Sequence, residues 1–124
     1  MKATVLAYGF DSKEAKPLKA ACAKLDIRLR RVEPAEYNQP IGVFFGLEPR
    51  AEDTENAEPL PGRMLVLAGL TDRQLDVLLA ALRTARATES LKAVLTEHNT
   101  KWSAPALYAE LARARQEIEK TTEQ

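Results

Sequence analysis

VLAGLTDRQ, residues Val66 to Gln74, is the stretch that decides the fold, because a closely similar stretch occurs sixty residues earlier. VLAYGFDSKE, residues Val5 to Glu14, shows the same order of features: an apolar run, a glycine, a large apolar residue and a short polar segment. Gly9 corresponds to Gly69. Both stretches are typical of a β-strand that ends at a glycine and leads directly into a helix. The repeat therefore predicts two similar β–α units.

The polar residues after each glycine predict a helix start. Asp11 and Glu14 have the spacing of a capping box, in which the first side chain accepts from a backbone N–H and the second reaches back to the cap. Thr71 and Gln74 repeat that spacing. Pro17 lacks a backbone N–H, so we expect the first helix to be kinked or to begin near it. Apolar residues follow at helical spacing in both copies: Ala15, Leu18, Cys22 and Leu25, then Leu75, Leu78, Leu79 and Leu82.

A second strand and a second helix follow in each copy. Ile27–Val32 and Ser90–Leu95 alternate between apolar and polar residues, as a strand with one buried face does. We expect a short helix from Pro40 in the first copy. Ser103 is expected to cap a longer helix in the second copy.

The chain is expected to form a single domain of two similar halves, residues 1–47 and 63–115. An acidic, proline-containing loop at 48–62 joins them, and a frayed tail at 116–124 follows. Internal duplication of a strand–helix–strand–helix unit explains the repeat. The alternative is that any junction from a strand through glycine to a capped helix produces the same pattern.

The apolar character of the strands predicts their order in the sheet. Ala3–Tyr8 and Met64–Ala68 are apolar on both faces and belong in the centre, whereas the charged second and fourth strands belong at the edges. We predict an α+β ferredoxin-like fold with an antiparallel sheet of order 4-1-3-2. In it, the extra helices or a second subunit cover the open face. The alternative is a parallel doubly wound α/β sheet of order 2-1-3-4.

Composition limits the classes of function. Lys plus Arg and Asp plus Glu are 18 each, so no net charge attracts nucleic acid or an anionic membrane, and we expect neither as a partner. The longest apolar run, MLVLAGL, is too short to span a bilayer. Cys22 is the only cysteine, which excludes an intrachain disulfide and a cysteine cluster for zinc. We expect a cytoplasmic protein without a metal or cofactor.

Two long segments carry a family resemblance. They are LVLAGLTDRQLDVLLAALR and LKAVLTEHNTKWSAPALYAELARAR, and DIRLRR and YNQPIG add to them in the first half. Together they resemble a bacterial family of uncharacterised proteins, Domain of Unknown Function 3783. The resemblance implies no activity, ligand or cofactor.

The run Glu97-His98-Asn99 follows the fourth strand and contains the only histidine. Functional residues often lie in such loops, so these residues, with Trp102 and Tyr8, are candidates for binding a small molecule. Nucleophilic catalysis would need a Ser or Cys beside His98, and a metal site would need further ligands. The alternative is structural: the run is a turn that leads into a helix cap, and Trp102 fills the core beneath it. Cys22 lies on the apolar stripe of the first helix and is expected to be a core residue.

Two further groups suggest binding surfaces. Tyr37, Phe44 and Phe45 form either core or an exposed apolar patch for a partner, and that choice stays open. The second strand carries the basic residues Arg28, Arg30 and Arg31. An RNA-binding sheet also needs aromatic residues for stacking, and none flank these arginines in the sequence, so a solvated edge strand is favoured.

The sequence favours a non-catalytic binding or regulatory module that self-associates, with a homodimer as the expected assembly. Its partner, whether a protein or a small molecule, is not identified by any motif. The alternative is a small-molecule enzyme with its site at the Glu97–Trp102 turn.

Overall fold

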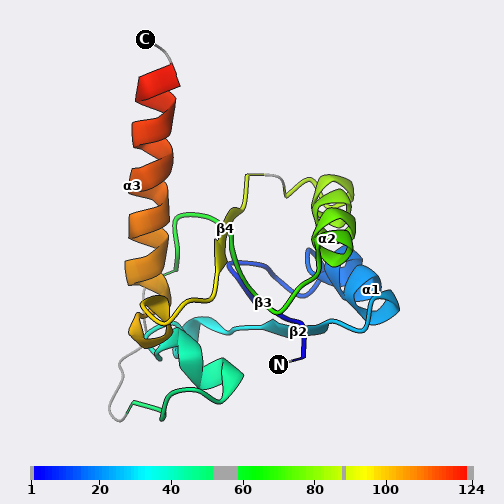
Figure 1. The fold of residues 1–124 in the computed structure, drawn as a ribbon, viewed down its shortest axis with the longest axis horizontal. Helices are drawn as coiled ribbons and strands as arrows, with labels where there is room; N and C mark the ends of the chain where they lie inside the picture. The colour runs from blue at the N-terminus through cyan, green and yellow to red at the C-terminus, as the bar shows by residue number, and fades with distance from the viewer. Residues whose placement is uncertain (1, 52–58, 88, 123–124) are drawn as a thin grey trace.

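The protein is an α+β domain built on one four-stranded mixed sheet (Figure 1). The computed structural model describes residues 2–51, 59–87 and 89–122. The predicted loop at 48–62 therefore lies partly outside the described residues. The elements in chain order are β1 (Thr4–Tyr8), α1 (Lys16–Lys24), β2 (Arg28–Arg31), η1 (Pro34–Glu36), η2 (Ile41–Phe45), β3 (Met64–Ala68), α2 (Asp72–Thr84), β4 (Leu91–Val94), η3 (Asn99–Lys101) and α3 (Ala104–Thr122).

The strand order is β2-β1-β3-β4. The central positions of β1 and β3 and the edge positions of β2 and β4 confirm that part of the prediction. The ferredoxin-like order 4-1-3-2 is wrong, because each crossover helix joins two strands that are direct neighbours. β1 is parallel to β2, and β3 is parallel to β4.

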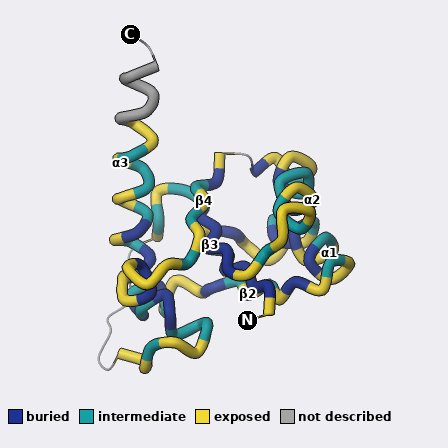
Figure 2. Tube along the Cα trace, in the orientation of Figure 1, coloured by how far each residue is buried: buried dark blue, intermediate teal, exposed yellow. Residues whose placement is uncertain are grey.

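The alternative, a fully parallel doubly wound sheet, had the right order and the wrong strand directions. β1 and β3 are antiparallel, and their register pairs Thr4 with Ala68 and Tyr8 with Met64. The two halves therefore meet along their most apolar strands, which run in opposite directions. Every residue of both strands is buried (Figure 2).

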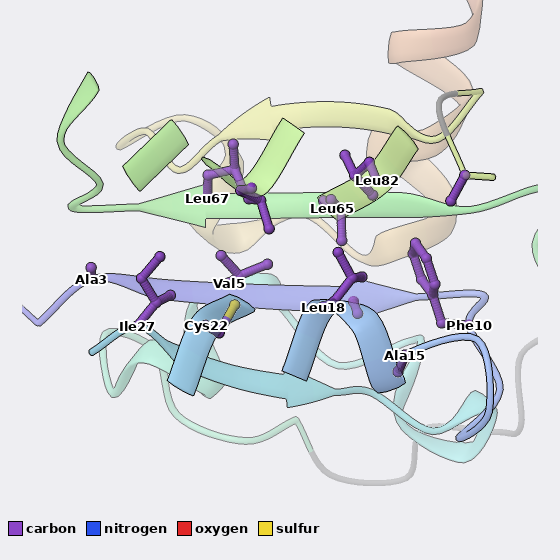
Figure 3. Packing of buried hydrophobic residues seen from close by; sticks show 13 residues of the cluster. Ala3, Val5, Phe10, Ala15, Leu18, Cys22, Ile27, Leu65, Leu67 and Leu82 are labelled. Carbon is purple, nitrogen blue, oxygen red and sulfur yellow. The ribbon is translucent and has the colours of Figure 1, made fainter. Parts of the chain in front are cut away.

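The sheet separates two hydrophobic clusters. One face of β1 and β3 packs against α1 and α2, with Val5, Leu18, Leu65 and Leu82 in the middle of the layer (Figure 3). The opposite face is covered by Tyr37, η2 and the start of α3, and its cluster includes Leu6, Tyr8, Met64 and Leu107. Both faces of the sheet are covered within one chain, so no second subunit is needed to bury them.

The two halves share hydrogen bonds at equivalent positions. Glu14 N donates to Asp11 Oδ1 at 2.7 Å and Asp11 N to Glu14 Oε1 at 3.0 Å, and Thr71 and Gln74 form the same reciprocal pair. Each helix then ends at a residue with positive φ, 57° at Asp26 and 55° at Arg86. These matches agree with the predicted repeat, and the duplication itself stays a prediction.

The helix starts differ. α2 begins directly at its capping box, whereas α1 begins only at Lys16, with Pro17 in its first turn. The expectation that the first helix begins near Pro17 is confirmed, because a proline fits a first turn, where backbone N–H groups have no helical acceptor. At the other end of the chain, α3 is helical through Thr122, beyond residue 116 where a frayed tail was expected. α3 extends away from the sheet (Figure 1).

Side chains donate hydrogen bonds to carbonyl groups at the ends of α1 and α2. Gln74 Nε2 in α2 donates to the carbonyl of Leu25 at the end of α1, at 3.1 Å. Glu14, at the equivalent position, is a carboxylate and cannot donate. There Arg63 forms an ion pair with Glu14 and also donates to the carbonyl of Arg86 after α2. Among the described residues, no helix is long and apolar enough to cross a membrane.

Candidate anion-binding pocket

The predicted turn at Glu97–Trp102 is held together by Asn99. Its side chain accepts from Thr96 N at 2.8 Å and donates to Val94 O at 3.0 Å, and Asn99 is buried. All these bonds close the turn after β4. The Asn99 side chain is therefore committed to the backbone, as the structural alternative predicted.

The charged residues of this turn and His98 face solvent, whereas Thr100 is buried. Glu97 and His98 are exposed. The idea that Trp102 fills the core is wrong, because 39% of its surface is exposed. Its backbone makes the structural contact instead, since Ile41 N donates to Trp102 O at 2.9 Å and so joins η2 to η3.

Tyr8 does not approach this turn. The turn follows Val94, which pairs with Leu67 near the end of β3, whereas Tyr8 pairs with Met64 at its start. The Tyr8 ring is fully buried, and its hydroxyl has no hydrogen-bond partner among the described residues. Burial, and next the neighbouring Tyr37, raise the pKa of Tyr8 well above its ordinary value. The five predicted site residues are thus not gathered around one cavity, and whether any of them binds a ligand stays a prediction.

The predicted interface residues belong largely to the core. Tyr37 is buried, its hydroxyl accepts from Gly9 N at 3.0 Å, and its ring lies 5.7 Å from that of Tyr8. Phe44 and Phe45 are half-buried and pack against the same cluster. Their exposed edges are the part of this group that a ligand could reach.

Most of the basic residues around β2 form ion pairs with carboxylates. Arg30 lies 3.4 Å from Glu36 and 4.8 Å above the centre of the Phe44 ring. Arg50 shares Glu36 at 3.0 Å, and Arg31 pairs with Glu33 at 2.6 Å. An aromatic ring therefore does lie beside the arginines, which their sequence neighbours do not reveal.

Arg28 differs from these arginines. It is exposed at the start of β2 and forms no ion pair within the part of the chain that the structure describes. It pairs in register with Thr4 at the start of β1. Lys2 lies beside them, because the Thr4 hydroxyl donates to Lys2 O at 2.8 Å. The Lys2 ammonium is 3.3 Å from Asp26, an exposed pair that neutralises it only weakly.

These residues border a cavity of about 260 Å³. Its lining residues come from the starts of β1 and β2 and from the end of η2: Lys2, Thr4, Arg28, Phe44, Phe45 and Gly46. Gly46 has φ 74°, and a Cβ there would meet nothing within 4 Å. Two cations and two aromatic rings at one cavity suit a small anion with an apolar body. No group of three metal-ligating side chains occurs within the described ranges.

The family comparison concerns the second half. Residues 63–118 match the family model described as Domain of unknown function (DUF3783). The predicted family is thereby confirmed for this segment, which runs from the start of β3 into α3. All six pocket residues lie before the DUF3783 segment, so the family match says nothing about the pocket. No curated protein and no solved structure matches the chain.

Proposed function

We propose that this protein is a non-catalytic binding module that holds a small anionic ligand in the pocket between β1, β2 and η2. One observation carries the proposal: Arg28 lines the cavity and has no ion-pair partner among the described residues, while the arginines near it do. An unpaired guanidinium beside apolar walls can bind a carboxylate or phosphate through two parallel hydrogen bonds.

The walls indicate the rest of the ligand. Phe44 and Phe45 are half-buried, so an apolar group on the ligand would cover their remaining exposed surface. A cavity of about 260 Å³ is slightly below the usual range for drug-sized ligands, which favours a compact molecule such as an aromatic acid. The ligand class is therefore a compact aromatic carboxylate or phosphate ester.

Titration calorimetry with three probes tests the proposal: benzoate, phenyl phosphate and the neutral benzyl alcohol. We expect at least one anion to bind and benzyl alcohol not to bind. Arg28→Ala should weaken the binding roughly tenfold or more, as the loss of a charge-assisted pair does. The matched control is Arg73→Ala, an exposed arginine in the first turn of α2. Equal weakening by both variants, or no binding of either anion at 5 mM or so, would overturn the proposal.

Self-association is the second part of the proposed function. β4 is an edge strand, and Val94 in it is 64% exposed, the largest exposed fraction among the large apolar residues whose side chains the structure describes. An edge strand with an apolar exposed side chain supports pairing with a second copy. Sedimentation velocity should show a dimer that Val94→Lys removes. A wild-type protein that stays monomeric at high concentration argues against this part.

Origin and location complete the proposal. The hydrogen bonds repeated between the halves support an internal duplication. The single cysteine, Cys22, is buried and unpaired, which suits a cytoplasmic protein. A bacterial source is proposed on the family resemblance alone.

A further inference from the structure

A second cavity lies on the other side of the molecule, in the outer groove between α1 and α2. These helices lie side by side on one face of the sheet (Figure 1). The groove encloses about 370 Å³, and its lining is almost entirely apolar or small: Pro17, Ala20, Ala21, Lys24, Val77, Ala80, Ala81 and Thr84. It is separate from the pocket that Arg28 lines, because the sheet lies between them.

The groove has matching walls. Each helix contributes four residues at equivalent positions of the repeat, so that Ala20 faces the groove from α1 and Ala80 from α2. Four alanines leave room for close approach of another backbone. Val77 is 37% exposed and provides an apolar surface that solvent now covers. Such a shallow channel between two helices is the shape that receives a third helix.

The rim of the groove is cationic. Lys24 lines it, and Lys16, Arg73 and Arg83 lie one turn from lining residues on exposed helix positions. None of these four side chains forms an ion pair in the described parts of the chain. Among the described residues of α1 and α2, Asp76 is the one carboxylate at an equivalent rim position. The rim therefore attracts a negatively charged partner and disfavours a second copy of the same groove.

We propose that this groove binds an acidic amphipathic helix of a partner protein. The apolar stripe of that helix would lie on the alanines and Val77, and its flanking carboxylates would face the rim cations. Buried apolar area supplies the affinity, and the charges select acidic helices over basic ones. This inference does not depend on the anion pocket.

Fluorescence anisotropy with designed peptides tests it. The probe is a labelled 18-residue helical peptide with leucines at i, i+3, i+4 and i+7 and glutamates beside them. The control peptide has lysines in place of the glutamates. We expect the acidic peptide to bind the full-length protein at least tenfold more tightly than the basic one, by a margin that shrinks in high salt.

Two variants separate the groove from general charge. Ala20→Arg fills the groove while adding a positive charge, and it should weaken binding of the acidic peptide at least tenfold. Ala23→Arg adds the same charge at an exposed α1 position that does not line the groove but corresponds to the rim residue Arg83, so it should leave binding unchanged or make it slightly tighter. Circular dichroism and melting curves establish that both variants fold.

Three results would overturn the proposal: no binding of the acidic peptide at 1 mM or so, equal binding of both peptides, or equal effects of the two variants. Self-association lost in Ala20→Arg and kept in Ala23→Arg would identify a second copy as the occupant and overturn it too. Because benzoate and phenyl phosphate bind on the opposite face of the sheet, their binding should be the same in both variants.

Discussion

Replacing Tyr8 or Tyr37 by phenylalanine removes one hydroxyl oxygen from the core and leaves each ring in place. Their rings lie in one cluster, 5.7 Å apart, and both are buried. The Tyr8 hydroxyl has no hydrogen-bond partner among the described residues, whereas the Tyr37 hydroxyl accepts from Gly9 N at 3.0 Å. Replacement by phenylalanine thus removes an unsatisfied polar group at one position and a hydrogen bond at the other.

The expected changes in unfolding free energy have opposite signs. Burial of an unsatisfied polar group costs about 1–3 kcal/mol, so Tyr8→Phe should stabilise the protein by about 1–2 kcal/mol. Tyr37→Phe loses a hydrogen bond and leaves Gly9 N without its acceptor, so it should destabilise by about 1–2 kcal/mol. The ring packing is the same in both variants, which makes each the control of the other.

Urea unfolding followed by circular dichroism measures both changes. The two variants should differ by about 2–4 kcal/mol in unfolding free energy, with unchanged m-values. A spectroscopic pH titration adds a second check, because burial raises the pKa of Tyr8 and its hydroxyl should ionise at a higher pH than an exposed tyrosine. The reasoning is refuted if Tyr8→Phe destabilises the protein as much as Tyr37→Phe does.

Four more substitutions test local features. Gly9→Ala should lower the unfolding free energy by about 3 kcal/mol or more, because φ is 80° and the new Cβ would lie 2.6 Å from a backbone oxygen. Gly46→Ala, at φ 74° in open space, should lower it by only about 1–2 kcal/mol. Urea unfolding measures both changes, and equal losses would contradict this expectation. Burial raises the pKa of Cys22 to about 11, above its unfolded value, so its contribution to stability is complete below about pH 9 and is lost as the pH rises toward 11. Cys22→Ala should lower stability at neutral pH and flatten the fall between pH 9 and 11, and an unchanged slope in pH-dependent urea unfolding would oppose the assignment. Gln74→Glu keeps an oxygen for the helix cap but loses the donor to the carbonyl at the end of α1, so it should lower the unfolding free energy by about 1 kcal/mol. An unchanged midpoint in urea unfolding would show that this hydrogen bond contributes nothing.

The sequence predicted the elements better than their order in the sheet. Met64–Ala68 was predicted with its observed bounds, because an apolar run between a proline-rich loop and a glycine leaves little choice. The capping box at Thr71 and Gln74 was predicted from local spacing, which suffices because the cap is a local interaction. The antiparallel pairing of β1 with β3 belongs to the predicted antiparallel sheet. The position of β2 beside β1 and of β4 beside β3 was not predicted, since it depends on where each crossover connection returns the chain to the sheet.

The candidate pocket was also missed. Lys2, Thr4 and Arg28 come from separate segments and meet only through the pairing of β1 with β2, so no motif marks them. Phe44 and Phe45 are adjacent in the sequence, but their position beside basic residues depends on the fold of η2 against the sheet. No sequence signal marks Arg28 either, because Asp26 stands two residues before it and only the structure shows that Asp26 pairs with Lys2.

The antiparallel pairing of β1 with β3 has a consequence for shorter chains. A polypeptide containing only residues 63–118 would retain β3, α2, β4 and most of α3, but it would lack β1, the antiparallel neighbour of β3. Its most apolar strand would then be an open edge. Two such polypeptides could hydrogen-bond the open backbone edges of their β3 strands by pairing them antiparallel, with the register that β1 has on β3 in the present chain. One molecule of the protein would thus contain the approximate two-fold arrangement that a dimer of half-length chains would form from two molecules.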